Sequence, residues 1–244
     1  MLVHTNALMG SLDMRPFVEE INRSGKHWHS VINQAAAQRA LLPYQTQPPE
    51  DLEQKFIEAA KKLATLGWTV PMAMTPRGIF LLSEQIDAAE VDAQFVGFYR
   101  RDGRDALPGR GFGSARLARW NPLLEQCSDS YRRGNYLICI PSLITVLEGA
   151  IALPEEIEFI RGQDRQIFFK GKIDDCGDDL LMRALWESMD TFVSHLFQYA
   201  GFDTVRPLRI NRHWILHGRD LPDWKQADAL RLFQALETLC ILFP

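Results

Sequence analysis

The sequence predicts an all-α protein, and three observations support this fold class. Apolar residues recur at three- and four-residue spacing along most of the chain, as they do in amphipathic helices. Strand-like alternation is scarce, and its best candidate is the short segment 165–173, RQIFFKGKI. No segment repeats at a fixed period, which excludes solenoids and propellers. We therefore expect a bundle of helices with at most one short strand.

Within the first hundred residues, the helical pattern is weak before residue 49 and strong after it. Residues 1–50 include plausible helical segments and end in the proline-rich stretch 43–50, which we interpret as a linker. The segment 49–66 is strongly helical, because acidic residues fill its first turn and Gly67 follows its last. A proline-bearing loop and a second helix come next, over 68–78 and 83–99.

Residues 100–119 differ from both flanks. They contain six arginines and two aspartates among glycines and a proline, a composition typical of a solvated connector. We interpret this stretch as a linker rather than a patch that touches RNA. It divides the chain into a helical N-terminal region, 1–119, to which the sequence assigns no role, and a helical bundle, 120–244.

From Trp120 onward the pattern is that of a compact bundle. Capping residues, glycine stops and apolar stripes predict four helices, at 121–133, 135–152, 178–201 and 225–243. The stretch 154–178 is polar and irregular, and it contains the strand candidate. The last helix keeps its apolar spacing to the end, which suits a bundle core or a seam between subunits.

Composition indicates an ordinary globular protein. Of the 244 residues, 46% are hydrophobic and 24% charged, and the net charge of −4 excludes a protein that coats nucleic acid with its whole surface. The four cysteines form no C-x-x-C pair, so we expect free thiols in a reducing cytosol. No signal peptide is predicted, and the most apolar stretch, 136–153, fits a buried helix better than a membrane span. We therefore expect a cytoplasmic protein without a membrane partner.

A cationic stretch, PLRINRHWILHGRD at 207–220, lies between the last two predicted helices. Pro207 suits the first turn of a helix and Gly218 its end, so about three helical turns are predicted over 207–217. Four apolar residues would anchor this helix to the bundle: Ile210, Trp214, Ile215 and Leu216. It would then carry five cationic or titratable side chains, namely Arg209, Arg212, His213, His217 and Arg219.

Arg212 and His217 fit the Arg-x4–6-His signature of HEPN domains, and roughly residues 120–244 resemble this family of helical bundles. The motif lies between a long amphipathic helix and a final helix, as in that family, and the helix pair at 131–151 looks like the first half of such a bundle. The position after Arg212, where asparagine is frequent in the family, is His213. Asn211 precedes Arg212 and would lie on a different helical face.

The resemblance implies a metal-independent endoribonuclease of the toxin or phage-defence type, which acts on RNA without a cofactor. It also implies a homodimer with two motifs facing across a cleft, and it allows for an antitoxin or other regulatory protein as a partner. A noncatalytic HEPN-like module that binds RNA or protein is the alternative, because a fold can persist while its function changes. A purely structural Arg212, paired within the bundle, is a third interpretation.

The residue types suit RNA cleavage. A histidine near its ordinary pKa can move protons to and from the ribose 2′-hydroxyl or the leaving 5′-oxygen, and an arginine fork can hold the scissile phosphate. Five helical residues span about 7.5 Å of rise, and the two side chains diverge, so a site composed from two copies is natural. We predict His217 as general acid and base and Arg212 as the phosphate-binding residue. Residues with a supporting or RNA-contacting role are Glu148, Arg209, Asn211, His213 and Arg219.

Glu148 lies on the face of its predicted helix that also carries Ile144 and Ile151, so we expect it to be buried or nearly buried. A buried carboxylate needs a partner, and Arg212 or a motif histidine could supply it. A partly exposed glutamate near the helix end is equally compatible with the sequence.

The histidines also allow interpretations other than a nuclease site. His213 and His217 share a helical face, a spacing found in zinc sites, with Asp220 and Asp223 as the nearest carboxylates. No third ligand stands at a clear spacing, so we do not expect a metal. The histidines of HWH at 27–29 are expected at the surface. His195 lies on the apolar side of its helix and is expected to be a core histidine.

Overall fold

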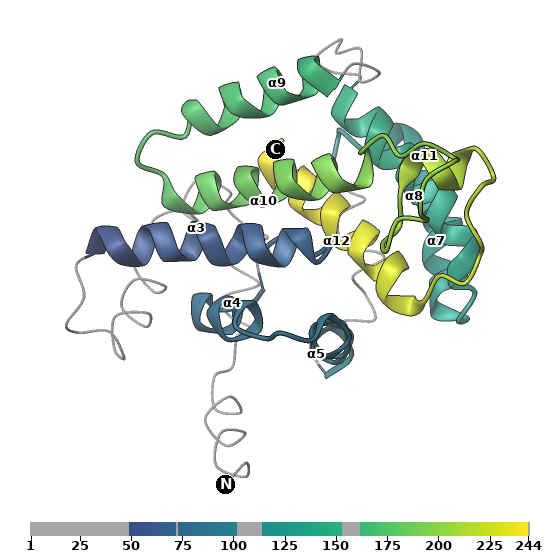
Figure 1. The fold of residues 1–244 in the computed structure, drawn as a ribbon, viewed down its shortest axis with the longest axis horizontal. Helices are drawn as coiled ribbons and strands as arrows, with labels where there is room; N and C mark the ends of the chain where they lie inside the picture. Colours follow the sequence, from purple (N-terminus) through teal and green to yellow (C-terminus); the bar gives the residue numbers. More distant parts are fainter. Residues whose placement is uncertain (1–48, 72, 102–113, 153–161, 244) are drawn as a thin grey trace, which may run out of the picture. The chain divides into compact units, whose positions relative to one another are not determined.

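The computed structural model describes residues 49–71, 73–101, 114–152 and 162–243 (Figure 1). These ranges all belong to one compact unit, Gln47–Pro244. The predictions for the first 48 residues, including HWH, and for most of the arginine-rich linker lie outside the described residues. Every regular element within the described ranges is a helix, so the all-α prediction is confirmed. None of the described helices has the length and apolar character needed to cross a membrane.

The first described helix, α3 (Pro49–Thr65), agrees with the prediction, and Gly67 follows it with a φ of 89°. The next two helices differ from the prediction. Helix α4 (Pro76–Ser83) occupies part of the predicted loop, because Thr75 caps it by accepting from the Gly78 amide and Pro76 stands in its first turn. Helix α5 (Ala88–Arg101) begins five residues later than predicted, where Asp87 accepts from the Ala89 amide.

The second half contains the predicted helices and two differences. A short 3-10 helix, η1 (Ala118–Trp120), leads into α7 (Asn121–Arg132), α8 (Tyr136–Ala152), α10 (Leu180–Leu196) and α12 (Gln226–Leu242). The strand prediction for 165–173 was wrong, because this segment lies within helix α9 (Gly162–Asp174). Helix α9 packs against α10 and buries Phe169, so its run of apolar residues is met by another helix rather than by a sheet. The helix in the cationic stretch, α11 (Arg212–Leu216), is much shorter than predicted.

Helix α12 lies at the centre of the packing, and α8, α10 and α5 all contact it. Residues on nearly every face of α12 are buried, including the polar side chains of Arg231, Gln234 and Thr238. Arg231 forms ion pairs with Asp228 of its own helix and with Asp92 of α5. This central helix was predicted as a bundle core or a subunit seam, and the structure supports the core.

Helices from the two predicted regions pack directly against each other. Figure 1 shows α3 and α10 running side by side, and their contact buries Ala60, Leu63 and Ala64 of α3 completely. On α5, Asp92 accepts a hydrogen bond from Trp68 Nε1 at 2.9 Å as well as pairing with Arg231.

Candidate functional site

The cationic stretch lies in the long connection between α10 and α12, where α11 contacts α8 (Figure 1). Asn211 explains why α11 is short. Its φ of −131° and ψ of 124° are extended, and its side chain caps the helix by accepting from the Trp214 amide at 3.1 Å. Residues before Asn211 are therefore outside the helix, and Gly218 ends the motif with a φ of 66°. Asn211 is itself buried and also donates to the Gln198 carbonyl, so its observed contacts are structural.

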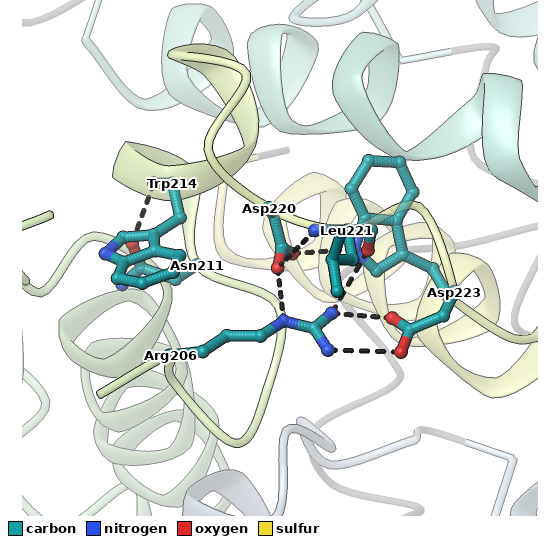
Figure 2. Close-up of polar contacts among 7 residues, drawn as sticks. Arg206, Asn211, Trp214, Asp220, Leu221 and Asp223 are labelled. Carbon is teal, nitrogen blue, oxygen red and sulfur yellow. Dashed lines mark hydrogen bonds and ion pairs between the residues drawn. The ribbon is translucent and has the colours of Figure 1, made fainter. Parts of the chain in front are cut away.

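An arginine that the sequence analysis did not single out joins the two ends of this connection (Figure 2). Arg206, before α11, donates from Nε to Asp220 at 2.5 Å and from both terminal nitrogens to Asp223 at 3.1 and 2.5 Å. Trp224 Nε1 donates to the other Asp220 oxygen at 2.7 Å. We name these four residues the Arg206 clamp. The hydrogen bonds to the two carboxylates raise the pKa of Arg206, and the same contact lowers the pKa of Asp223.

The clamp bears on the metal interpretation of the two motif histidines. Asp220 and Asp223, the carboxylates nearest to them in sequence, both face Arg206. Across the described ranges, no three histidine, cysteine or carboxylate side chains gather as metal ligands would. The two nearest carboxylates in sequence are thus paired with Arg206, and the rings of His213 and His217 contact each other.

Apolar contacts hold α11 in place as the sequence predicts. Ile210, Trp214 and Ile215 are buried, and Trp214 Nε1 donates to the Ala200 carbonyl at 3.0 Å. Leu216, the fourth expected anchor, is exposed. Three anchors and the asparagine cap therefore fix the orientation of the short helix on the protein surface.

Arg212 pairs with Glu148 of α8, one of the partners expected for that carboxylate. Arg212 donates from Nε at 3.1 Å to one carboxylate oxygen and from a terminal nitrogen at 3.0 Å to the other. The two side chains are 32% and 23% exposed, so the pair lies at the surface of the bundle rather than in its core. A guanidinium has five N–H donors, and three remain after these two hydrogen bonds. Arg212 is therefore oriented by Glu148 and can still bind a second anion.

The two motif histidines lie in a cluster of rings. His213 stacks on Phe202, with ring centroids 4.7 Å apart and planes 7° from parallel. The His217 ring meets His213 edge-on at 4.7 Å, and Tyr199 meets His213 at 4.9 Å. The sequence analysis missed Phe202, because its signal is one aromatic residue in an irregular loop. We name Tyr199, Phe202 and His213 the aromatic shelf.

His213 and His217 differ in their exposure. The pKa of His213 is lowered from its ordinary value, first by burial and then by repulsion from His217 and Arg212. His213 is therefore more often neutral at neutral pH than a free histidine. His217 stands at the exposed C-terminal end of α11. His217 is thus the better placed of the two to exchange protons with a ligand or with solvent.

The structure separates the remaining predicted residues. Arg212 and His217 stand at opposite ends of α11, and the His213 ring, next to Arg212 in sequence, contacts the His217 ring. Arg219 is exposed and lies over the Phe202 ring, 5.0 Å from its centroid. Arg209 lies near Arg231 of α12, and burial, followed by repulsion from Arg231, lowers the pKa of Arg209.

The prediction for His195 was wrong, because this side chain is exposed. It stands in the last turn of α10, and Tyr199, one turn further along, is 78% exposed. The buried apolar stripe of α10 ends at Leu196. The sequence pattern placed His195 beside Tyr199 on the apolar side, but both side chains are exposed at this end of the helix.

No protein-family model matches the chain, and neither a curated protein nor a solved structure matches it. The chemistry available at the site comes from its own residues: an oriented arginine with free donors, an exposed histidine, and an aromatic shelf beside them. Such a set can bind a phosphodiester and move a proton without a bound metal ion.

Proposed function

We propose that this chain is a metal-independent endoribonuclease of HEPN type. The observation that carries the proposal is the placement of Arg212 and His217. Both lie at the surface on one anchored helix, Arg212 is held in orientation by Glu148, and His217 is exposed at the other end. The Arg-x4-His spacing supports the family assignment, and the all-helical fold is compatible with it.

The proposed chemistry divides between the two residues. His217 takes the proton from the ribose 2′-hydroxyl as that oxygen attacks the phosphorus, or returns a proton to the leaving 5′-oxygen. Arg212 places its free N–H donors on the phosphate oxygens and stabilises the charge that builds on them. Glu148 fixes the guanidinium in one orientation, which preserves its geometry during the reaction.

A homodimer with a composite site completes the proposal. Five residues of helix rotate the side chain by roughly 140° and separate the two residues by about 7.5 Å, so Arg212 and His217 of one copy diverge. Two copies related by a twofold axis bring the arginine of one against the histidine of the other. A role in toxin action or phage defence, restrained by an antitoxin or another regulatory protein, follows from the same family assignment.

The test is cleavage of labelled single-stranded RNA by the purified protein in EDTA. We expect wild-type protein to cleave, and Arg212→Ala and His217→Ala each to lose about 10²–10⁴-fold in rate. Arg77→Ala and His195→Ala are matched controls, because they remove an exposed arginine and an exposed histidine outside the site. Circular dichroism and light scattering verify that all four variants keep their fold and association state. Undiminished cleavage by both site variants would refute the proposal.

A second candidate is a noncatalytic module that binds RNA or a protein partner. Several large apolar side chains around α11 are exposed and favour such a binding surface: Tyr199, Phe202, Val205, Leu208 and Leu221. This candidate predicts that no RNA tested is cleaved by the wild-type protein, while Arg212→Ala still weakens binding. Binding assays on the same variants therefore separate it from the nuclease.

A further inference from the structure

The aromatic shelf exposes rings that the fold itself does not cover. Tyr199 is 78% exposed and Phe202 42% exposed, although phenylalanine is usually buried and tyrosine is intermediate. The structure nevertheless orders them, since Tyr199 contacts the His213 ring and Phe202 stacks on it. Exposed, ordered aromatic rings are typical of surfaces that bind a planar or apolar partner.

The cationic neighbours indicate what that partner is. The guanidinium carbon of Arg219 lies 5.0 Å from the centroid of the Phe202 ring. Arg212 directly precedes His213 and keeps three N–H donors free of Glu148. The surroundings of the shelf thus combine ring faces with donors for an anion. A single-stranded nucleic acid presents this pair of features in every nucleotide, because each has a flat base and a charged phosphate.

His213 suits stacking rather than charge pairing. Burial and the repulsion by His217 and Arg212 hold the pKa of His213 below its ordinary value. Its ring is nearly parallel to Phe202, so the two form one continuous apolar stack. Tyr199 contacts the His213 ring at an interplanar angle of 49° and is 78% exposed, so its ring is open to a further planar partner.

We infer that the aromatic shelf is a nucleobase-stacking subsite for single-stranded RNA, in which Tyr199 is the specificity-determining residue. The inference rests on the proposed function, since it places the shelf beside the phosphate held by Arg212. A base stacked on Tyr199 must be unpaired and splayed out, so the protein would select loops and single strands over duplexes. Stacking tolerates any base, so it selects for strandedness rather than for sequence.

Binding is measured by fluorescence anisotropy in the His217→Ala background, so that the RNA stays intact. The probes are a mixed-sequence single-stranded RNA 12-mer, its blunt duplex, and the same strand made with abasic residues. We expect Tyr199→Ala to weaken binding of the base-bearing single strand by about 5- to 100-fold. Tyr199→Phe should bind like the parent, and Tyr199→Leu should resemble Tyr199→Ala, because leucine keeps apolar area but lacks a ring face. Ile167→Ala, which removes another exposed apolar side chain, is the matched control.

The outcomes separate this inference from the nuclease proposal. Equal affinity of Tyr199→Ala and its parent for the base-bearing single strand would overturn the stacking subsite, even if Arg212→Ala abolishes cleavage. Tyr199-dependent binding by a wild-type protein that never cleaves would support the subsite and refute the nuclease. Failure of the parent to bind any probe, or dissociation of a dimer by Tyr199→Ala in light scattering, would also overturn it, the latter by showing that the shelf contacts protein.

Discussion

At the scale of single residues, the account depends on how neighbours tune Arg212 and the two histidines. Glu148 orients the guanidinium through two hydrogen bonds. Burial, followed by repulsion from His217 and Arg212, lowers the pKa of His213, while His217 stays exposed. The sequence already indicated Arg212, His217 and a partner for Glu148, because motif spacing and helical periodicity are local signals. It could not show that His213 would stack on Phe202, since that contact joins the motif to an irregular loop.

The depressed pKa of His213 predicts a pH dependence of stability. Burial and two positively charged or titratable neighbours hold this pKa below 6.5 in the folded chain. Between the folded pKa and 6.5 the unfolded chain binds a proton that the folded chain does not, so the His213 contribution to stability is present above pH 6.5 and falls as the pH drops below it. We expect His213→Asn to flatten the decline of the urea midpoint between pH 7.5 and pH 5. An equal flattening by His195→Asn, an exposed histidine outside the shelf, would contradict this assignment.

At the scale of elements, the site is positioned by helix ends and by one polar cross-link. A predicted helix end was correct where a residue next to it in sequence ends the helix, as Gly67 does after α3. It was wrong where the helix end depends on a contact with a distant residue. The helix over 207–217 was predicted from Pro207 and Gly218, but Asn211 caps it instead, because its buried side chain also satisfies the Gln198 carbonyl. That carbonyl lies thirteen residues away, and no local pattern reveals it.

The Arg206 clamp should stabilise the connection that carries α11. Arg206→Ala would leave Asp220, whose side chain is 5% exposed, with Trp224 as its remaining side-chain donor among the described residues. We expect a loss of about 1–3 kcal/mol in unfolding free energy, with faster hydrogen exchange of amides in α11. Arg132→Ala is the control, because it breaks an exposed ion pair with Asp129 and should cost less than about 1 kcal/mol. Equal costs for the two variants would show that the clamp adds no stability.

Close packing between Gly149 of α8 and Trp120 gives a further prediction, for the helix that carries Glu148. A Cβ added at Gly149 would lie 2.6 Å from Cζ2 of Trp120, so Gly149→Ala forces the indole to move. We expect a loss of about 1–3 kcal/mol in unfolding free energy, measured by urea denaturation. The matched change Gly171→Ala in α9 meets no atom within 4 Å and should stabilise by about 0.5–1 kcal/mol. The prediction fails if both variants shift stability in the same direction.

At the scale of the whole molecule, the described helices form one unit that crosses the predicted boundary at residue 119. The all-α class followed from periodicity, which each helix displays by itself. The pairing of α3 with α10 could not be predicted in this way, because apolar stripes identify which face is buried but not which helix buries it. The same limit explains the strand expected at 165–173, where Phe168 and Phe169 pack against Trp186 of α10.

This packing predicts how fragments behave. A chain of residues 120–244 would expose the face of α10 that α3 covers, and Arg231 of α12 would lose its ion pair with Asp92 of α5. We expect that fragment to aggregate or to lack cooperative unfolding, while residues 47–244 unfold in one transition by circular dichroism. Cooperative unfolding of the shorter fragment, with stability equal to that of the longer one, would show that α3 and α5 are dispensable.

The central claim is that Arg212 and His217 cleave RNA in a site shared by two copies, and mixing two inactive variants tests it most directly. Arg212→Ala and His217→Ala are unfolded together, refolded as a mixture, and assayed on labelled RNA in EDTA. The account predicts at most about a hundredth of the wild-type rate for either variant alone. It predicts recovery of about a quarter of the wild-type rate in the mixture, because half of the dimers then contain one intact site of two. Cleavage at the wild-type rate by either variant alone would contradict it.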